Sequence, residues 1–213
     1  MTTAEQFDLD CRLCPRLADF LDQVGEQFPD YHARPVAPFG DPDARLLVVG
    51  LAPGMHGANA TGRPFTGDHA GVLLYQTLHR HGFASAPESV SVTDRLTLPD
   101  CRITNAVKCL PPQNKPVGQE INTCRRFLEN ELQTLKPGSV ILALGSIAHK
   151  SVVAALGLRQ KALVFAHAAE HALADDMTLL DSYHCSRYNT QTKRLTDEMF
   201  DAVFARARVL LGD

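Results

Sequence analysis

Several features that define large protein classes are missing from this chain. It contains no run of about 18 apolar residues, the length that a membrane-spanning helix requires. Its first residues, MTTAEQFDLD, are polar and acidic, so no secretory signal peptide is expected there. The formal net charge of -3 argues against a bulk, sequence-independent attraction to nucleic acid, although a local basic face is compatible with it. These absences favour a cytoplasmic protein without a membrane anchor.

The composition and the spacing of apolar residues indicate an α/β fold. With 213 residues and a hydrophobic content of 45%, the chain fits one domain over residues 1–213, and no linker or internal repeat divides it. Apolar runs predict strands at residues 45–51, 102–107, 139–144 and 178–183, with a weaker one at 162–166. Helical patterns lie at residues 73–81, 119–136, 146–156 and 193–211. Strands that alternate with helices predict a sandwich around a largely parallel sheet.

Residues 50–68, with the sequence GLAPGMHGANATGRPFTGD, form the most informative stretch. They follow the apolar run at 46–49, and five glycines allow a ligand to approach the backbone closely. Phe65 offers a flat stacking face, and Asp68 is the only acid in the segment. The pattern fits neither the dinucleotide-binding fingerprint nor the phosphate-binding P-loop. A ligand site at the carboxyl end of a strand is one interpretation, and an ordinary surface loop is the other.

The chain has six cysteines, and without an export signal they are not expected to form a disulfide framework. Cys11 and Cys14 form a Cys-x2-Cys pair before the first strand. Cys109 follows a strand, and Cys124 lies on the next helix. Four cysteines from these two places can surround one centre, and their spacing does not choose between zinc and an iron–sulfur cluster. Cys101, at the start of a strand, is expected to be a small buried apolar side chain.

Three segments together resemble the iron–sulfur branch of the uracil-DNA glycosylase superfamily, and within it family 5, the broad-specificity B type. They are residues 50–68, NAVKCLPPQNKP at 105–116 and HCSRYNTQTKRL at 184–195. The motifs occur in the family's order, and the resemblance covers most of the chain. It implies a central four-stranded parallel sheet flanked by helices. It also implies a [4Fe–4S] cluster, with the ligands Cys11, Cys14, Cys109 and Cys124.

The function that the resemblance implies is base-excision repair. Such an enzyme hydrolyses the bond between DNA and uracil or other deaminated bases, such as hypoxanthine. We expect a monomeric, monofunctional enzyme that leaves an abasic site, because no lysine is evident as a Schiff-base nucleophile. Lys108 is the nearest candidate by motif, and its place beside Cys109 suggests a backbone or phosphate contact instead.

The resemblance assigns recognition of the base to Phe65 and Asn105. The reaction needs a base out of the stack, and Phe65 can stack on it. The amide of Asn105 carries a donor and an acceptor that can meet O4 and N3–H of uracil, whereas cytosine presents the opposite pattern. A strand-end asparagine can alternatively form a turn. The remaining substrate contacts are assigned to Gly54, Ser186 and Asn189.

The chemical step is assigned to His184 and Asp68. The imidazole of His184 can donate to O2 of the departing base, where negative charge grows as the bond breaks. Asp68 can hold or deprotonate water and can stabilise positive charge on the sugar. Asp68 can also serve as the N-cap of a helix that starts near residue 70, and the two roles can coexist.

The chain differs from other branches of the superfamily at several positions. Those branches place a polar, water-activating residue directly after the strand glycine, whereas this chain has Leu51, Ala52 and Pro53, as family 5 does. The second motif usually begins His-Pro-Ser, and here Cys185 replaces a proline that would fix the backbone. Ala60 stands where a basic residue is expected, so one contact to DNA phosphate is missing.

Two other functions are compatible with parts of the sequence. A non-catalytic iron–sulfur protein that binds nucleic acid or carries electrons would need the cysteines, but it would not need Phe65, Asp68, Asn105 and His184 in one pocket. A zinc-stabilised α/β hydrolase of free nucleosides is the second alternative. Iron–sulfur protein is coloured and zinc protein is not, so an absorbance spectrum separates these alternatives.

Overall fold

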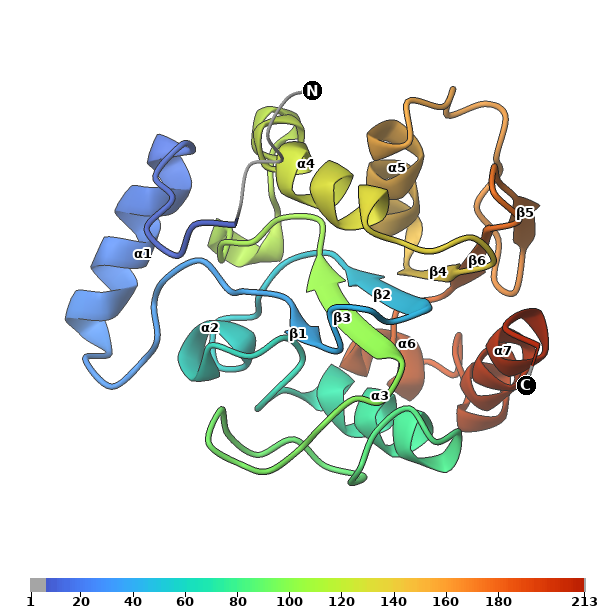
Figure 1. Ribbon diagram of the computed structural model, residues 1–213. Helices are drawn as coiled ribbons and strands as arrows, with labels where there is room; N and C mark the ends of the chain where they lie inside the picture. The colour runs from blue at the N-terminus through green and yellow to red at the C-terminus, as the bar shows by residue number, and fades with distance from the viewer. Residues whose placement is uncertain (1–6, 213) are drawn as a thin grey trace.

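A mixed sheet lies between two layers of helices in the computed structural model, which describes residues 7–212 (Figure 1). The strands are β1 (Phe39–Gly40), β2 (Leu46–Gly50), β3 (Cys101–Asn105), β4 (Val140–Leu144), β5 (Glu170–Ala172) and β6 (Thr178–Ser182). Their order in the sheet is β1-β3-β2-β4-β6-β5. The four inner strands run parallel, and each edge strand is antiparallel to its neighbour.

The prediction of a four-stranded parallel sheet is therefore wrong in strand number, because the sheet has six strands. The edge strands β1 and β5 contain two and three residues, too few to show an apolar alternation. The weak strand predicted at residues 162–166 is absent, since that part of the chain has no regular structure. The four inner strands agree with the predicted ranges to within two residues at each end.

The inner strands are buried on both faces, which is typical of parallel strands covered by helices. Along β2, Leu46 and Val48 pack into one apolar cluster, with residues of α3 (His69–Arg80) and α7 (Asp197–Leu210). Leu47 and Val49 pack into a second cluster, with residues of α4 (Gly118–Gln133) and α5 (Ser146–Ala155). The sheet thus separates two apolar layers, and the two pairs of helices cover its opposite faces (Figure 1).

A third apolar cluster lies outside these two layers and joins α1 (Pro15–Gln27) to the segment that follows β3. Leu17, Leu21 and Val24 of α1 pack there with Val107 and Leu110. The remaining helices are short, namely α2 (Ala58–Thr61), the 3-10 turn η1 (Pro112–Asn114) and α6 (Arg187–Gln191). Within residues 7–212, every helix is too short or too polar to cross a bilayer.

Candidate active site and cysteine centre

The carboxyl ends of neighbouring strands bring the predicted site residues to one edge of the sheet. Gly50, the last residue of β2, pairs in register with Asn105, the last residue of β3. His184 follows two residues after the end of β6. A cavity of about 660 Å³ opens at this edge. Six of the seven predicted catalytic and substrate-binding residues line it, namely Gly54, Phe65, Asp68, Asn105, His184 and Ser186.

Phe65 and Asn105 meet above Gly50, and the absence of a side chain at Gly50 makes this possible. A Cβ atom on Gly50 would lie 2.4 Å from Oδ1 of Asn105 and 2.8 Å from Cζ of Phe65. Both side chains are buried in the cavity wall. Phe65 has a φ angle of +55°, a region that costs an L-residue about 1–2 kcal/mol, so its surroundings must hold it there.

His184 lies next to Phe65, with ring centroids 5.9 Å apart and an angle of 26° between the ring planes. Burial lowers the pKa of His184 below its ordinary value, and the negative charge of Asp68 acts in the opposite direction. The imidazole is therefore neutral at pH 7. A neutral imidazole still carries one N–H, so His184 can donate a hydrogen bond without bringing a positive charge into the site.

Asp68 combines a structural role with a position in the cavity. Its Oδ1 accepts a hydrogen bond of 2.9 Å from the N–H of Gly71, which makes Asp68 the N-cap of α3, as predicted. The loop after β2 passes close to the other oxygen, since a Cβ on Gly57 would lie 2.7 Å from Oδ2. The helix cap therefore occupies Oδ1 of Asp68, and the residue also lines the cavity.

Ser186 and Asn189 organise the backbone after His184. The hydroxyl of Ser186 caps α6 by accepting from the N–H of Asn189 at 3.5 Å. The side-chain amide of Asn189 donates to the carbonyl of His184 at 2.8 Å. Asn189 lines a neighbouring cavity of about 230 Å³, which shares Leu51 and His184 with the first, and it does not line the cavity that contains Asp68. These bonds hold the segment in which Cys185, fully buried in the apolar core, replaces the usual proline.

The position of Lys108 contradicts the prediction that this residue makes a backbone or phosphate contact. Its side chain is buried between β3 and α4. The ammonium group donates to Oε1 of Glu131 at 2.5 Å and to the hydroxyl of Thr104. This ion pair directs Lys108 away from the cavity and into the interior. Spacing along the chain cannot show this, because the partner lies on a helix 23 residues away.

The cavity wall also contains three residues to which the sequence assigned no role in the pocket: His56, Asn114 and Arg187, the last a candidate for a local basic face. Nδ1 of His56 forms a hydrogen bond of 2.8 Å with the hydroxyl of Tyr31, in the segment after α1. Asn114 has a φ angle of +55° in the turn that follows β3. All three belong to the motif segments at 50–68, 105–116 and 184–195. Membership of those segments was the only available signal, since such residue types are ordinary in loops.

The four predicted cysteine ligands converge at a second place, under α1. Cys11, Cys14, Cys109 and Cys124 line one small cavity, together with apolar residues of the third cluster. The backbone N–H of Lys108 lies 3.3 Å from Sγ of Cys124 and donates to it. The other two cysteines lie elsewhere: Cys101 is fully buried in β3, as predicted, and Cys185 lies in the core near His184.

The environment of the four cysteines favours their neutral thiol form unless a metal binds. Burial raises the pKa of Cys109 and that of Cys124, the latter to about 11. The negative charges of the other sulfurs raise the pKa of Cys109 further. Thiolates are the metal-binding form of cysteine, so four of them can coexist here only if a metal centre compensates their charge.

The donor set of this second place fits a metal centre. Four cysteine sulfurs can hold either one zinc ion or an iron–sulfur cluster, and their convergence alone does not choose between the two. A further group of potential ligands lies within residues 7–212, namely His149, His171 and Asp181, whose ligand atoms all lie within 4.8 Å of one another.

Comparison with known proteins gives consistent matches. The family model described as Uracil DNA glycosylase superfamily matches residues 37–208. A Type-5 uracil-DNA glycosylase of Thermus thermophilus is 49% identical over 210 residues, which cover 95% of this chain and 94% of that protein. The Type-5 uracil-DNA glycosylase of Mycobacterium leprae is 41% identical over 210 residues, covering 95% and 92%. That of Pyrobaculum aerophilum is 40% identical over 208 residues, covering 96% and 90%.

Proposed function

The chain belongs to the uracil-DNA glycosylase superfamily, and we propose that it excises uracil from DNA as a monofunctional enzyme that leaves an abasic site. The observation that carries this proposal is the convergence of Phe65, Asp68, Asn105 and His184 on one cavity. These side chains come from three separate parts of the sequence: the loop after β2, the end of β3 and the segment after β6. Each has a chemical property that cleavage of the bond between base and sugar requires.

Recognition depends on the pair above Gly50. The flipped base stacks on Phe65, and the amide of Asn105 pairs with O4 and N3–H of uracil. Cytosine offers an amino group and an unprotonated nitrogen at the same positions, so it would leave the amide unpaired. An unpaired buried polar group costs about 1–3 kcal/mol, which disfavours the normal base.

The chemical step separates charge, and His184 and Asp68 lie on the cavity wall to stabilise it. Electrons from the breaking bond move onto the base, and the N–H of His184 donates to O2 of uracil as that oxygen becomes negative. Positive charge develops on the sugar, and the carboxylate of Asp68 stabilises it and orients a water for attack at C1′. Lys108 is buried against Glu131, which supports hydrolysis rather than a Schiff-base route.

We extend the proposal to other deaminated bases, hypoxanthine among them. The segment directly after β2 lines the cavity with Leu51 and Ala52, which make no polar contact to the edge of a base. Base recognition thus depends on few polar groups, and O6 and N1–H of hypoxanthine present the same acceptor and donor to the amide of Asn105 as O4 and N3–H of uracil do. A pocket with few edge contacts discriminates weakly among bases.

The cysteines at positions 11, 14, 109 and 124 would hold a [4Fe–4S] cluster, whose bound iron compensates the charge of four buried thiolates. The role proposed for it is structural, because these ligands join the start of α1 to α4 and to the segment after β3, which also contributes Asn114 to the catalytic cavity. Thiolate ligands need a reducing compartment, which supports a cytoplasmic location. We further propose that the single domain acts as a monomer.

The alternative of a non-catalytic iron–sulfur protein explains the cysteines but leaves the four cavity residues without a reason to converge. An excision assay separates the two. Single-turnover incubation with a duplex that contains one uracil should give an abasic site, seen as strand cleavage only after alkali. A duplex with thymine at that position is the matched control. Absence of uracil release would contradict the proposed function, and cleavage without alkali would contradict a monofunctional reaction.

A further inference from the structure

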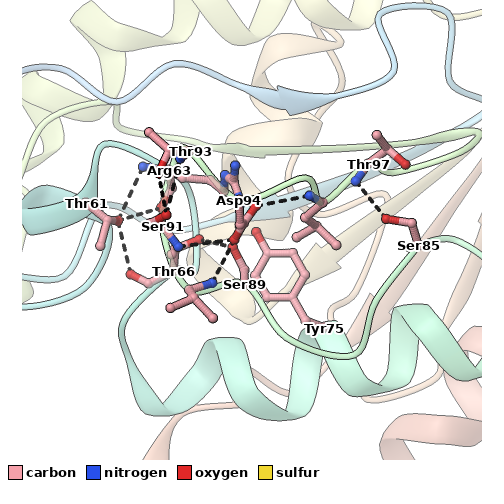
Figure 2. A network of polar contacts seen from close by, with 12 residues as sticks. Thr61, Arg63, Thr66, Tyr75, Ser85, Ser89, Ser91, Thr93, Asp94 and Thr97 are labelled. Carbon is pink, nitrogen blue, oxygen red and sulfur yellow. Dashed lines mark hydrogen bonds and ion pairs between the residues drawn. The ribbon is translucent and has the colours of Figure 1, made fainter.

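A second segment, residues 84–98, contacts the loop that carries Phe65. We call this segment the strap. The strap crosses from the end of α3 to the start of β3. Its two ends are joined by the N–H of Ser85, which donates to the carbonyl of Thr97, and by the N–H of Thr97, which donates to the hydroxyl of Ser85, both at 2.9 Å. Figure 2 shows Ser89 and Asp94 of the strap beside Arg63 and Thr66 of the loop after β2.

Arg63 makes the strongest contact between this loop and the strap. Its guanidinium donates to Oδ1 of Asp94 at 2.6 Å and to the hydroxyl of Ser89 at 3.0 Å (Figure 2). It also lies over the ring of Phe39 in β1, 4.2 Å from the ring centroid. The side chain of Arg63 is only 5% exposed, so this ion pair is shielded from solvent and geometrically fixed.

The residues on either side of Phe65 are anchored in the same region. The hydroxyl of Thr66 lies 2.6 Å from the hydroxyl of Ser89 in the strap. The hydroxyl of Tyr75, in α3, donates to the carbonyl of Pro64 at 2.8 Å. The side chain of Phe65 cannot form a hydrogen bond of this kind, and the φ angle of Phe65 is positive. Its neighbours therefore provide the restraint that the strained backbone needs.

Asp94 is in turn fixed by the strap, because its carboxylate accepts from the N–H groups of Val90, Ser91 and Leu96. The Arg63–Asp94 pair thus connects two organised backbones rather than two free side chains. Arg63 does not line the catalytic cavity, and it does not contact the base in our proposed mechanism. Any effect of Arg63 on excision must therefore pass through the loop.

We infer that Arg63 is a positioning residue for base excision, and that its ion pair with Asp94 fixes Phe65 in the cavity wall. This inference rests on the proposed function. The conservative change Arg63→Lys keeps the charge but removes the planar guanidinium that lies over Phe39, and Asp94→Asn keeps the shape but removes the charge. Each should slow single-turnover excision of uracil about tenfold to a hundredfold, since a displacement of about 1 Å can cost that much.

A matched control is available at the opposite end of the sheet. Arg45, before β2, donates to Oδ2 of Asp100 at 2.6 Å, also from a partly buried pair. Arg45→Lys should leave excision unchanged, and any loss of melting temperature that it shares with Arg63→Lys measures general destabilisation. Circular dichroism serves as the fold control for all variants. If Arg63→Lys fails to fold, Asp94→Asn provides the same test.

A double-mutant cycle distinguishes positioning from general destabilisation. If Arg63 acts through Phe65, Arg63→Lys should have little further effect on the excision rate in a Phe65→Ala background. Equal slowing in both backgrounds would overturn the inference, and so would wild-type excision by Arg63→Lys when Phe65→Ala is slow. Both of those results leave the proposed function intact. Normal excision by Phe65→Ala would instead contradict the proposed recognition of the base, and the inference with it.

Discussion

The rings of Phe65 and His184 lie nearly parallel, with their centroids 5.9 Å apart, although one follows β2 and the other follows β6. The contact places a stacking surface and a hydrogen-bond donor side by side on one wall of the cavity. A flat base that enters against Phe65 therefore brings an edge within reach of His184. This pairing defines how the reaction should respond to pH.

The first prediction is that excision requires neutral His184. Because burial lowers the pKa of this histidine below 6.5, the imidazole stays neutral through pH 7 and gains a proton only on the acid side. The single-turnover rate should therefore be constant from pH 8 to about 6.5 and should fall only at lower pH. His184→Gln, which keeps an N–H donor but cannot titrate, should be slower than the wild type and should lack this acid limb. A rate that increases as His184 becomes protonated would contradict the assignment.

The second prediction separates the two roles of Asp68. Asparagine is as good an N-cap as aspartate, so Asp68→Asn should keep the stability of α3 while removing the carboxylate. We expect it to slow excision by about 10²–10⁴-fold, the usual contribution of a general acid or base. Asp68→Ala should be equally slow and should also lose about 1 kcal/mol of stability. Near-normal single-turnover rates for Asp68→Asn would reduce Asp68 to a helix cap.

The third prediction concerns the cysteine centre. Purified protein should be brown and should contain iron and sulfide. Alanine at Cys11, Cys14, Cys109 or Cys124 should abolish the colour, because each removes one of the four sulfurs around the cavity. Cys101→Ala is the matched control, since Cys101 is buried in β3 and should leave the spectrum unchanged. A colourless, zinc-loaded enzyme with full activity would exclude the cluster.

The sequence predicted most of this arrangement because the strong signals are local. Apolar runs such as 46–49 identify the inner strands, and parallel strands must bring their carboxyl ends to one edge, so Asn105 and His184 could be expected near Gly50. The edge strands escaped prediction because two or three residues carry no periodic pattern. Long-range polar pairs escaped for another reason. Lys108 with Glu131 and Arg63 with Asp94 depend on contacts that no spacing encodes.

The fourth prediction concerns stability in acid. Burial opposes ionisation of Asp94, but hydrogen bonds from Arg63 and from three backbone N–H groups outweigh it and lower its pKa from 3.8 to about 2. A lowered pKa adds stability that is complete above about pH 4 and is lost as the pH falls toward 2. This shift corresponds to about 2 kcal/mol. Urea unfolding of wild type and Asp94→Asn should therefore differ at pH 6, and the difference should narrow as the pH falls to 3.

The control for acid stability is Asp22→Asn. Asp22 also pairs with an arginine, Arg12, but both side chains are more than half exposed. Solvent weakens such a pair, so its removal should change the free energy of unfolding little at either pH. If both substitutions changed the free energy of unfolding equally, burial would add nothing to the stabilisation by the Arg63–Asp94 pair.

The last prediction concerns substrate range. Asn105 provides the polar edge recognition in our mechanism, and Leu51 and Ala52 add none, so the enzyme should release hypoxanthine as well as uracil, but more slowly. Uracil opposite guanine should react faster than uracil opposite adenine, because flipping a mispaired base costs less unpairing energy. Asn105→Ala should reduce the rates for uracil and hypoxanthine alike, since both bases present the same acceptor and donor to the amide. Single-turnover rates on duplexes that differ only at the lesion test all three statements. Strict preference for uracil in single strands, with no release of hypoxanthine, would contradict this prediction but not the glycosylase activity. It would show that Asn105 discriminates between bases more strictly than the small number of polar groups in the cavity indicates.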